Sequence, residues 1–431
     1  MQLVINMLGI VVILGLMFLL SKDKKGIPYK TILIALAIQF GIAFVLVKFP
    51  LGKIAVQNVS AVVTTILDYG KDGLSFVFGG LADGGAPTGF IFAIQTLGNI
   101  VFVSALVAAL YYLGVLGFII KVIGKVVGKV LGTTQVESFV AVANMFLGQT
   151  ESPILISKYL GGMTDSEVLV VLVSGMGSMS ATIIGGYTAL GIPMEYLLIA
   201  SALVPLGSII ISKILLPEKQ EMRVLETSKV GSKGKNTNSV NSATLEEAAT
   251  LETQPANELK IDNKGNNANL IDAISEGAMN GLNTALAIGA SLIAIIALVA
   301  LVNGFLGLFG FSLETIFAYL FSPIGYLMGF SGEDILTAGQ LLGSKLVLNE
   351  FVAFQSLGEI LSGLSYRTGI VITIALCGFA NFSSMGVCIS GISALCPEKR
   401  STLARLAFKA MIGGFTVSVL SARIVGVITL I

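Results

Sequence analysis

The sequence contains no histidine among its 431 residues, and this absence excludes several kinds of active site. Without an imidazole there is no Ser-His-Asp or Cys-His nucleophile system and no zinc site built on histidine. The three cysteines, Cys377, Cys388 and Cys396, lie in or beside one apolar segment, so we expect no disulfide framework. No Asp-Asp or cysteine-rich cluster replaces them, and the chain is not expected to be an enzyme.

Charge is also scarce. Only 12% of the residues are charged and 55% are hydrophobic, whereas a soluble domain carries roughly 25% charged residues. Apolar runs of about 20 residues recur along the chain, enough to cross about 30 Å of hydrocarbon. The net charge is +1 and no basic patch is interleaved with aromatics, so nucleic acid is not an expected partner. The sequence predicts an all-α polytopic membrane protein.

About eight segments are apolar enough to span the bilayer as helices. They are residues 3–20, 29–48, 89–115, 164–190, 194–216, 271–303, 368–395 and 402–430. The first has no basic n-region and no small-residue cleavage site, so we expect a transmembrane helix there and not a signal peptide. An even number of spans places both termini on the same side.

Basic residues in the short loops predict the orientation. One set of loops is richer in them, so we expect it to be cytoplasmic and the termini to be external, in the cell (plasma) membrane, the inner membrane of a bacterium. The richer set contains Lys22, Lys24, Lys25, Lys30, Lys121, Lys125, Lys129, Lys399 and Arg400, and the opposite set Lys48, Lys53, Lys71 and Arg367.

Three further segments are not predicted to span. Residues 218–268 are polar and nearly free of aromatics, which predicts a disordered cytoplasmic linker between two halves of the chain. The stretch "KVIGKVVGKVLG" at 121–132 places lysines on one helical face, which suits a helix in the membrane interface. A basic end to the preceding span is the alternative. Residues 53–80 are a second interfacial candidate.

Two leftover segments, 134–160 and 333–364, are moderately apolar, and each is broken close to a carboxylate. An arm of about 10–12 residues reaches only about 15–18 Å as a helix, so we expect re-entrant hairpins and not further spans. Each hairpin precedes two spans, and the two would enter from opposite sides. That arrangement is the inverted repeat of secondary transporters, which bind substrate where broken helices meet.

The first hairpin carries "GQTESP", with Gln149, Thr150 and Glu151 side by side. A carboxylate at mid-membrane costs roughly 2.5–3.5 kcal/mol on insertion scales, so it indicates a functional site. The alternative is a helix contact made by pairing Glu151 with Lys158. The neighbouring amide and hydroxyl suit hydrogen bonds to a polar ring edge.

The second hairpin repeats this pattern in "NEFVAF", where Glu350 could accept both hydroxyls of a vicinal diol or could instead pair with Lys345. The next span contains "CGFANFSSMG". There Asn381 and Ser384 lie three residues apart, on one helical face, and Phe379 adds a flat apolar surface. An asparagine within a span can also serve only to join helices.

A run of small residues at 174–187, "SGMGSMSATIIGGY", lies in the predicted fourth span. Such a run can unwind and free its carbonyls for a hard cation such as Na⁺, with side-chain oxygens from Asn144 and Ser178. Close packing of small residues between helices is the alternative.

Together "GQTESP", "NEFVAF" and "CGFANFSS" resemble, in this order, the signature motifs of the concentrative nucleoside transporters, and 269–304 is similar to their sixth span. The resemblance implies a nucleobase site at Gln149, Thr150 and Glu151. It places ribose at Glu350, Asn381 and Ser384, with Phe379 beside the base. It assigns Na⁺ to Asn144 and Ser178, with carbonyls of Leu147 and Met179.

The implied function is import of nucleosides of the uridine, cytidine and adenosine type by symport with Na⁺, without a cofactor, by a homotrimer. H⁺ coupling is the alternative for the ion, and a channel is the alternative from another class. Residues 1–132 and 269–332 would form the scaffold. Residues 133–217 and 333–431 would form the two transport halves, on either side of the linker 218–268.

Overall fold

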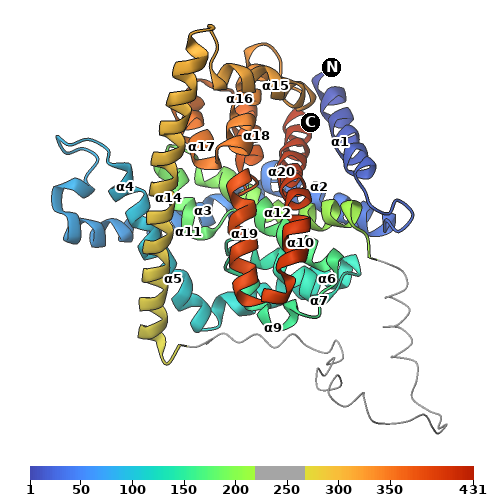
Figure 1. Cartoon of the computed structure of the whole chain (residues 1–431), viewed down its shortest axis with the longest axis horizontal. Coiled ribbons are helices and arrows are strands. Elements are labelled where there is room, and N and C mark those ends of the chain that lie inside the picture. The colour runs from blue at the N-terminus through green and yellow to red at the C-terminus, as the bar shows by residue number, and fades with distance from the viewer. Residues whose placement is uncertain (219–266) are drawn as a thin grey trace.

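A computed structural model of the chain describes residues 1–218 and 267–431, and all regular elements in these two ranges are helices (Figure 1). Apart from 218, 267 and 268, the predicted linker lies outside the described residues. The α-helices are α1 (Gln2–Leu19), α2 (Tyr29–Val47), α3 (Pro50–Phe78), α4 (Phe92–Gln95), α5 (Leu97–Tyr112), α6 (Val115–Leu131), α7 (Gln135–Ala143), α8 (Ser152–Leu155), α9 (Ser157–Leu160), α10 (Asp165–Gly177), α11 (Ala181–Ala189), α12 (Met194–Leu215), α14 (Leu270–Gly307), α15 (Leu313–Leu327), α16 (Glu333–Val347), α17 (Glu350–Ile360), α18 (Tyr366–Leu376), α19 (Phe382–Leu395) and α20 (Arg400–Leu430).

Eight helical segments in the described ranges are long and apolar enough to cross a membrane. They divide into an inner and an outer group. The most apolar stretches of α10–α11, α12 and α20 are 94%, 89% and 89% buried, whereas that of α14 is only 11% buried. A helix that is apolar yet exposed meets lipid in place of a protein core. Figure 1 shows α14 running along one side of the molecule.

Two expectations about the spans need correction. Residues 368–395 do not form one helix, because the chain leaves the helical path between α18 and α19. Residues 53–80 are mostly one helix, α3, of 29 residues, which by length and composition belongs to the eight candidates. A helix of this length was not expected from the prediction that residues 53–80 lie in the membrane interface.

The basic segment 121–132 belongs to α6, which is separate from α5. Between them Gly114 has φ 79°, a left-handed conformation that suits glycine. The three lysines of α6 are exposed, while Ile120 and Gly124 on an adjacent side of the helix are buried. The alternative of a basic end to the preceding span is therefore wrong.

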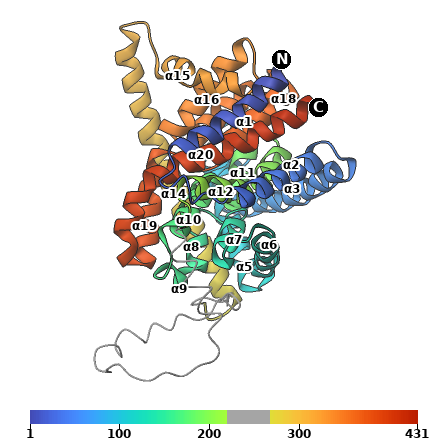
Figure 2. The ribbon, with the colours of Figure 1, turned by 90° about the vertical axis from the view of Figure 1, so that its right-hand side faces the viewer.

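Two halves of the chain repeat one order of elements. In each, a short hairpin precedes a broken helix and then a long helix: α7 to α12 in the first half and α16 to α20 in the second. Figures 1 and 2 both place α16 towards one end of the molecule and α7 with α9 towards the other. Both views also place the two chain termini at the same end.

The two helix breaks touch one another. The backbone N–H of Phe379, between α18 and α19, donates to the carbonyl of Ser178, between α10 and α11, over 3.1 Å. At Gly378 (φ 104°) a Cβ would lie 2.7 Å from the carbonyl oxygen of Gly177. Only glycine allows both this conformation and this approach. The contact brings the middles of both halves together.

Side-chain caps supply the hydrogen bonds that the interrupted helices lack. Ser180, Asn349 and Asn381 precede α11, α17 and α19, and each side chain accepts from a backbone N–H of the helix that it precedes. The first N–H groups of a helix have no partner within it. Inside a membrane no bulk water could satisfy them, so these caps stabilise the breaks.

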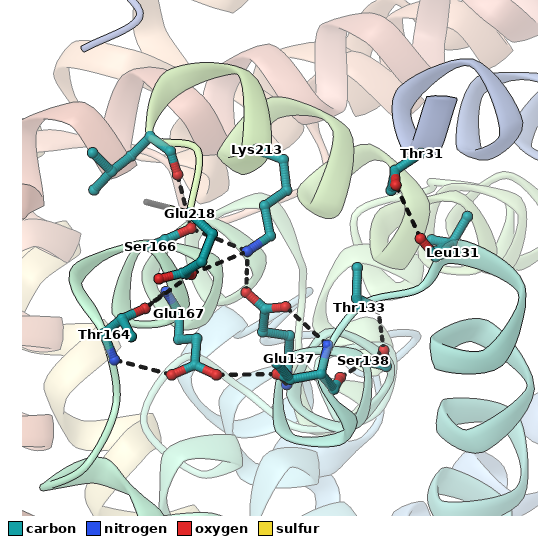
Figure 3. Close-up of polar contacts among 12 residues, drawn as sticks. Thr31, Leu131, Thr133, Glu137, Ser138, Thr164, Ser166, Glu167, Lys213 and Glu218 are labelled. Carbon is teal, nitrogen blue, oxygen red and sulfur yellow. Dashed lines mark hydrogen bonds and ion pairs between the residues drawn. The ribbon is translucent and has the colours of Figure 1, made fainter. Parts of the chain in front are cut away.

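A buried ion pair anchors the first arm of the first hairpin (Figure 3). Glu137 of α7 pairs with Lys213 of α12, and Lys213 also donates to Ser166 of α10 over 3.0 Å. Thr134 and Thr164 form capping boxes with Glu137 and Glu167, respectively. This network, which was not predicted from the sequence, ties three elements of one half together.

Candidate functional site

The tip of the first hairpin is the irregular stretch between α7 and α8. Its residues Gln149, Thr150 and Glu151 are half-buried, and the Glu151 carboxylate accepts from the backbone N–H of Gly148 over 3.3 Å. Because Pro153 follows at the start of α8, the chain cannot continue the helix backwards through the tip. The three polar side chains are therefore held on a turn.

This tip contacts α19 of the other half. Gln149 Nε2 donates to Ser384 Oγ over 3.4 Å, and Cys388 Sγ donates to Gln149 Oε1 over 3.3 Å. A Cβ at Gly391 would lie 3.0 Å from the methyl group of Thr150. The structure thus brings 149 and 150 onto one side of α19. Cys388 was not predicted as part of the site, although it lies one turn from Ser384.

Glu350 occupies the matching place in the second hairpin, as the first residue of α17. Its carboxylate accepts from Asn381 Nδ2 over 2.8 Å, and both residues are buried. In residues 1–218 and 267–431 Lys345 makes no ion pair with Glu350; it donates to Ala375, Cys377 and Ser418. The alternative of a Lys345–Glu350 pair is therefore wrong.

Asn381 and Ser384 do meet, although not as neighbours on one helical face. Asn381 caps α19, and its Oδ1 accepts from the Ser384 N–H over 2.9 Å and from Ser383 Oγ over 2.8 Å. The prediction of shared helical spacing needs this correction. The cap fixes the Asn381 side chain, and its Nδ2 is then directed at Glu350.

An aromatic group supports Glu350 from the first half. Tyr187 of α11 is fully buried, with its ring centroid 4.9 Å from that of Phe351 and 4.4 Å from that of Phe354. Its hydroxyl group lies against the Glu350 side chain and interacts with it. Tyr187 ends the small-residue run at 174–187, but nothing in the sequence linked it to α17. Phe379 is buried beside the contact between the breaks.

The four residues expected to hold a cation lie where the first hairpin meets the first break. Asn144 and Ser178 are fully buried, and Ser174 accepts from Asn144 over 2.9 Å. Across the same contact, Ala181 N–H donates to the Phe146 carbonyl over 2.9 Å. In residues 1–218 and 267–431 the carbonyls of Leu147 and Met179 accept no hydrogen bond.

This set of neutral oxygens fits Na⁺, which is a cargo here and not a resident cofactor. Hard cations take oxygen ligands from carbonyls, amides and hydroxyls. A coordinating group of three or more His, Cys, Asp or Glu residues does not occur in the part of the chain that the structure describes. Within the small-residue run 174–187 only residues 178–180 are unwound, and the remainder is helical in α10 and α11.

Family models cover nearly the whole chain. Residues 196–426 match the C-terminal part of the Na⁺-dependent nucleoside transporters and residues 8–81 the N-terminal part. Residues 93–194, which include Gln149 to Glu151, match a model described as nucleoside recognition. The chain belongs to the Na⁺-dependent, or concentrative, nucleoside transporter family.

Relatives and solved structures agree with this assignment. An uncharacterized transporter from Haemophilus influenzae is 37% identical and the nucleoside permease NupC from Helicobacter pylori 33% identical; both alignments cover 98% of this chain and 96% of the relative. The structure of CNTnw in an inward-facing substrate-bound state matches with a TM-score of 0.86 at 35% identity, over 100% of this chain and 99% of the other. This family member is therefore a Na⁺-coupled nucleoside symporter and not an enzyme.

Proposed function

We propose that the nucleoside binds between the tip of the first hairpin and α19, with the second hairpin at its ribose end. The contact of Gln149 with Ser384 and Cys388 carries this proposal, because it joins polar groups of both halves. Gln149, Thr150 and Glu151 recognise the nucleobase. Their amide, hydroxyl and carboxylate offer both donors and acceptors to a heterocyclic edge.

The ribose is bound by Glu350, Asn381 and Ser384, and Phe379 lies beside the base. Glu350 and Asn381 are already hydrogen-bonded over 2.8 Å, so sugar hydroxyls would enter a network with fixed directions. A carboxylate has two oxygens and can accept from two hydroxyls at once. This favours a ribose with both its 2′- and 3′-hydroxyls over a deoxyribose.

Coupling follows from the contact between the cation site and the base site. Asn144, Leu147, Ser178 and Met179 would hold Na⁺, and Leu147 is two residues before Gln149. An ion that draws the hairpin towards the first break therefore orders the tip that recognises the base. A membrane potential contributes about 2.3 kcal/mol per charge per 100 mV to the inward step.

The membrane arrangement is part of the same proposal. α7–α9 and α16–α17 are re-entrant hairpins that enter from opposite sides, and α6 lies in the cytoplasmic interface with its lysines among lipid phosphates. The termini are external and residues 218–268 are cytoplasmic. The transport halves, 133–217 and 333–431, move against a scaffold of 1–132 and 269–332, which forms a homotrimer.

Uptake of radiolabelled uridine into proteoliposomes tests this proposal. We expect saturable uptake that requires an inward Na⁺ gradient, competes with cytidine and adenosine, and is weakened by Gln149→Ala. A proton gradient in the absence of Na⁺ should not replace it. If uptake followed the proton gradient alone, the cation assignment would be wrong, and if Gln149→Ala left nucleoside competition unchanged, the base site would be misplaced.

A further inference from the structure

Lys345 is a fully buried lysine that the nucleoside and Na⁺ sites do not use. It lies in the last turn of α16, and its side chain is 0% exposed. Its ammonium group donates to the carbonyl of Ala375 over 2.9 Å, to the carbonyl of Cys377 over 3.0 Å and to Ser418 Oγ over 2.7 Å. All three hydrogens of the ammonium group are therefore used.

The acceptors explain why a cation is needed there. Ala375 and Cys377 stand at the C-terminal end of α18, just before the second break. The last carbonyls of a helix have no partner within the helix, and the end carries a partial negative charge. Since α18 ends inside the protein, water cannot reach these carbonyls, and a buried cation satisfies them. The ring of Phe415, with its centroid 5.5 Å from the ammonium nitrogen, covers the remaining side.

The first half has the same construction with a neutral residue. Asn144 follows the last turn of α7 and reaches Ser174 in the last turn of α10, as Lys345 of α16 reaches the end of α18. The long helix that follows contributes a hydroxyl in each half: Ser201 of α12 donates to the Met145 carbonyl over 2.7 Å, and Ser418 of α20 contacts Lys345. Where the first hairpin meets the first break, however, the carbonyls of Leu147 in the hairpin and Met179 in the break have no protein donor within the described residues.

We propose that the Lys345 ammonium is a tethered cation that takes, in the second half, the place that the exchangeable Na⁺ takes in the first. This inference rests on the proposed Na⁺ site. It makes Lys345 a positioning residue: it holds the end of α18, from which the chain runs through Phe379 to Asn381 and so to the ribose end of the site. The break between α18 and α19 then has a fixed conformation at all times. The break between α10 and α11 is ordered only when Na⁺ is bound.

Lys345→Ala opens a space with the shape of a propylammonium ion, which allows chemical rescue. In proteoliposomes we expect uridine uptake by Lys345→Ala to fall about tenfold or more, as for loss of hydrogen bonds to a charged group. Propylammonium should restore much of it, and 1-propanol, the neutral molecule of the same size, should not. The Na⁺ concentration for half-maximal uptake should change less than twofold in the rescued variant.

Two controls make the result specific. Lys399 also donates to a main-chain carbonyl, that of Met163 over 2.7 Å, but is only half-buried; Lys399→Ala should lose little uptake and ignore propylammonium. If Lys345→Ala does not fold, Lys345→Arg and Lys345→Met replace it, and the variant that keeps the charge should keep uptake.

Three results would overturn the proposal. The first is equal uptake by Lys345→Met and the unmodified protein, and the second is equal rescue of Lys345→Ala by 1-propanol and propylammonium. The third is an equal loss of uptake in Lys345→Arg and Lys345→Met. Thermal unfolding of Lys345→Ala with and without propylammonium is a second measurement that needs no transport. Absence of Na⁺-driven uptake in the unmodified protein would instead contradict the proposed function. A midpoint raised by propylammonium alone would still support the tethered cation.

Discussion

The two halves of this transporter share one order of elements but place their buried lysines differently. In the first half Lys213 pairs with a carboxylate, Glu137, at the far end of the hairpin from its tip. In the second half Lys345 donates to two carbonyls and a hydroxyl and forms no ion pair within the described residues; it lies directly beside the helix break. Lys213 neutralises the buried carboxylate of Glu137, whereas Lys345 places a positive charge at the C-terminal end of α18. In the function proposed above, the cation at the first break comes from solution.

The largest effect is expected from breaking the Glu137–Lys213 ion pair of the first half. Lys213→Met leaves Glu137 buried without its partner, and removal of one member of a buried ion pair costs about 3–5 kcal/mol. Thermal unfolding in detergent should show a strongly lowered midpoint. The double variant with Glu137→Gln should recover most of the loss, because the fully buried carboxylate is then neutral, and Glu218, the second carboxylate near Lys213 at 3.7 Å, is partly exposed. A double variant as unstable as Lys213→Met would show that the pair is not what matters.

Next in size is the loss of the Glu350 charge in the second half. Glu350→Gln removes the charged acceptor of Asn381, and hydrogen bonds to charged groups contribute about 1.5–3 kcal/mol, or roughly 10- to 100-fold in uptake. Nucleoside uptake should fall by that factor while the unfolding midpoint changes little. Glu359→Gln, on the exposed side of the same helix, is the control and should transport normally. Retention of uptake by Glu350→Gln would remove Glu350 from the site.

A smaller effect is expected at the first break. Asn144→Ser shortens a proposed ligand of Na⁺ and removes the hydrogen bond to Ser174, so about 1–1.5 kcal/mol, near tenfold, should be lost in Na⁺ affinity. The Na⁺ concentration for half-maximal uptake should rise, whereas the apparent nucleoside affinity at saturating Na⁺ should not. Unchanged Na⁺ dependence would contradict the assignment of the cation to Asn144.

The smallest effect is expected for an exposed ion pair. Asp165 of α10 and Arg405 of α20 meet over 2.8 Å, with side chains 45% and 50% exposed. Exposed pairs of this kind typically contribute about 0.2–1 kcal/mol, so Asp165→Asn should lower the unfolding midpoint only slightly. This variant calibrates the comparison of Lys213 with Lys345. A loss as large as that of Lys213→Met would mean that exposure does not control the strength of these pairs.

Much of this site could be predicted because its motifs are local. "GQTESP" and "NEFVAF" are polar interruptions of apolar runs, and such interruptions are expensive in a membrane. Gln149, Glu350, Asn381 and Ser384 were named on that basis, and the structure brings them together through α19. The long uninterrupted apolar segments, such as those of α12 and α14, were predicted for the same reason.

The break between α18 and α19 was not predicted, because its first four residues, 377–380, are as apolar as the helices around it. Gly378 is compatible with a helix in sequence, and only its contact with Gly177 and the bond from Phe379 to Ser178 show why the helix ends there. The hydrogen-bond partners of Lys345 could not be predicted from the sequence either, since Ser418 lies 73 residues away along the chain. Hydropathy carries no information on such distant pairs.

The sequence by itself determined that this is an all-helical membrane protein with polar sites in two hairpins, since burial in lipid restricts each segment independently of the others. Which polar groups meet was decided only by tertiary structure. Lys345 lies only five residues before Glu350 in the sequence, yet Lys345 donates to carbonyls at the end of α18 and Glu350 accepts from Asn381. Groups at helix ends that the fold brings together compete for hydrogen bonds with groups that are close in the sequence. In this protein the contacts at the helix ends form, and the Lys345–Glu350 pair does not.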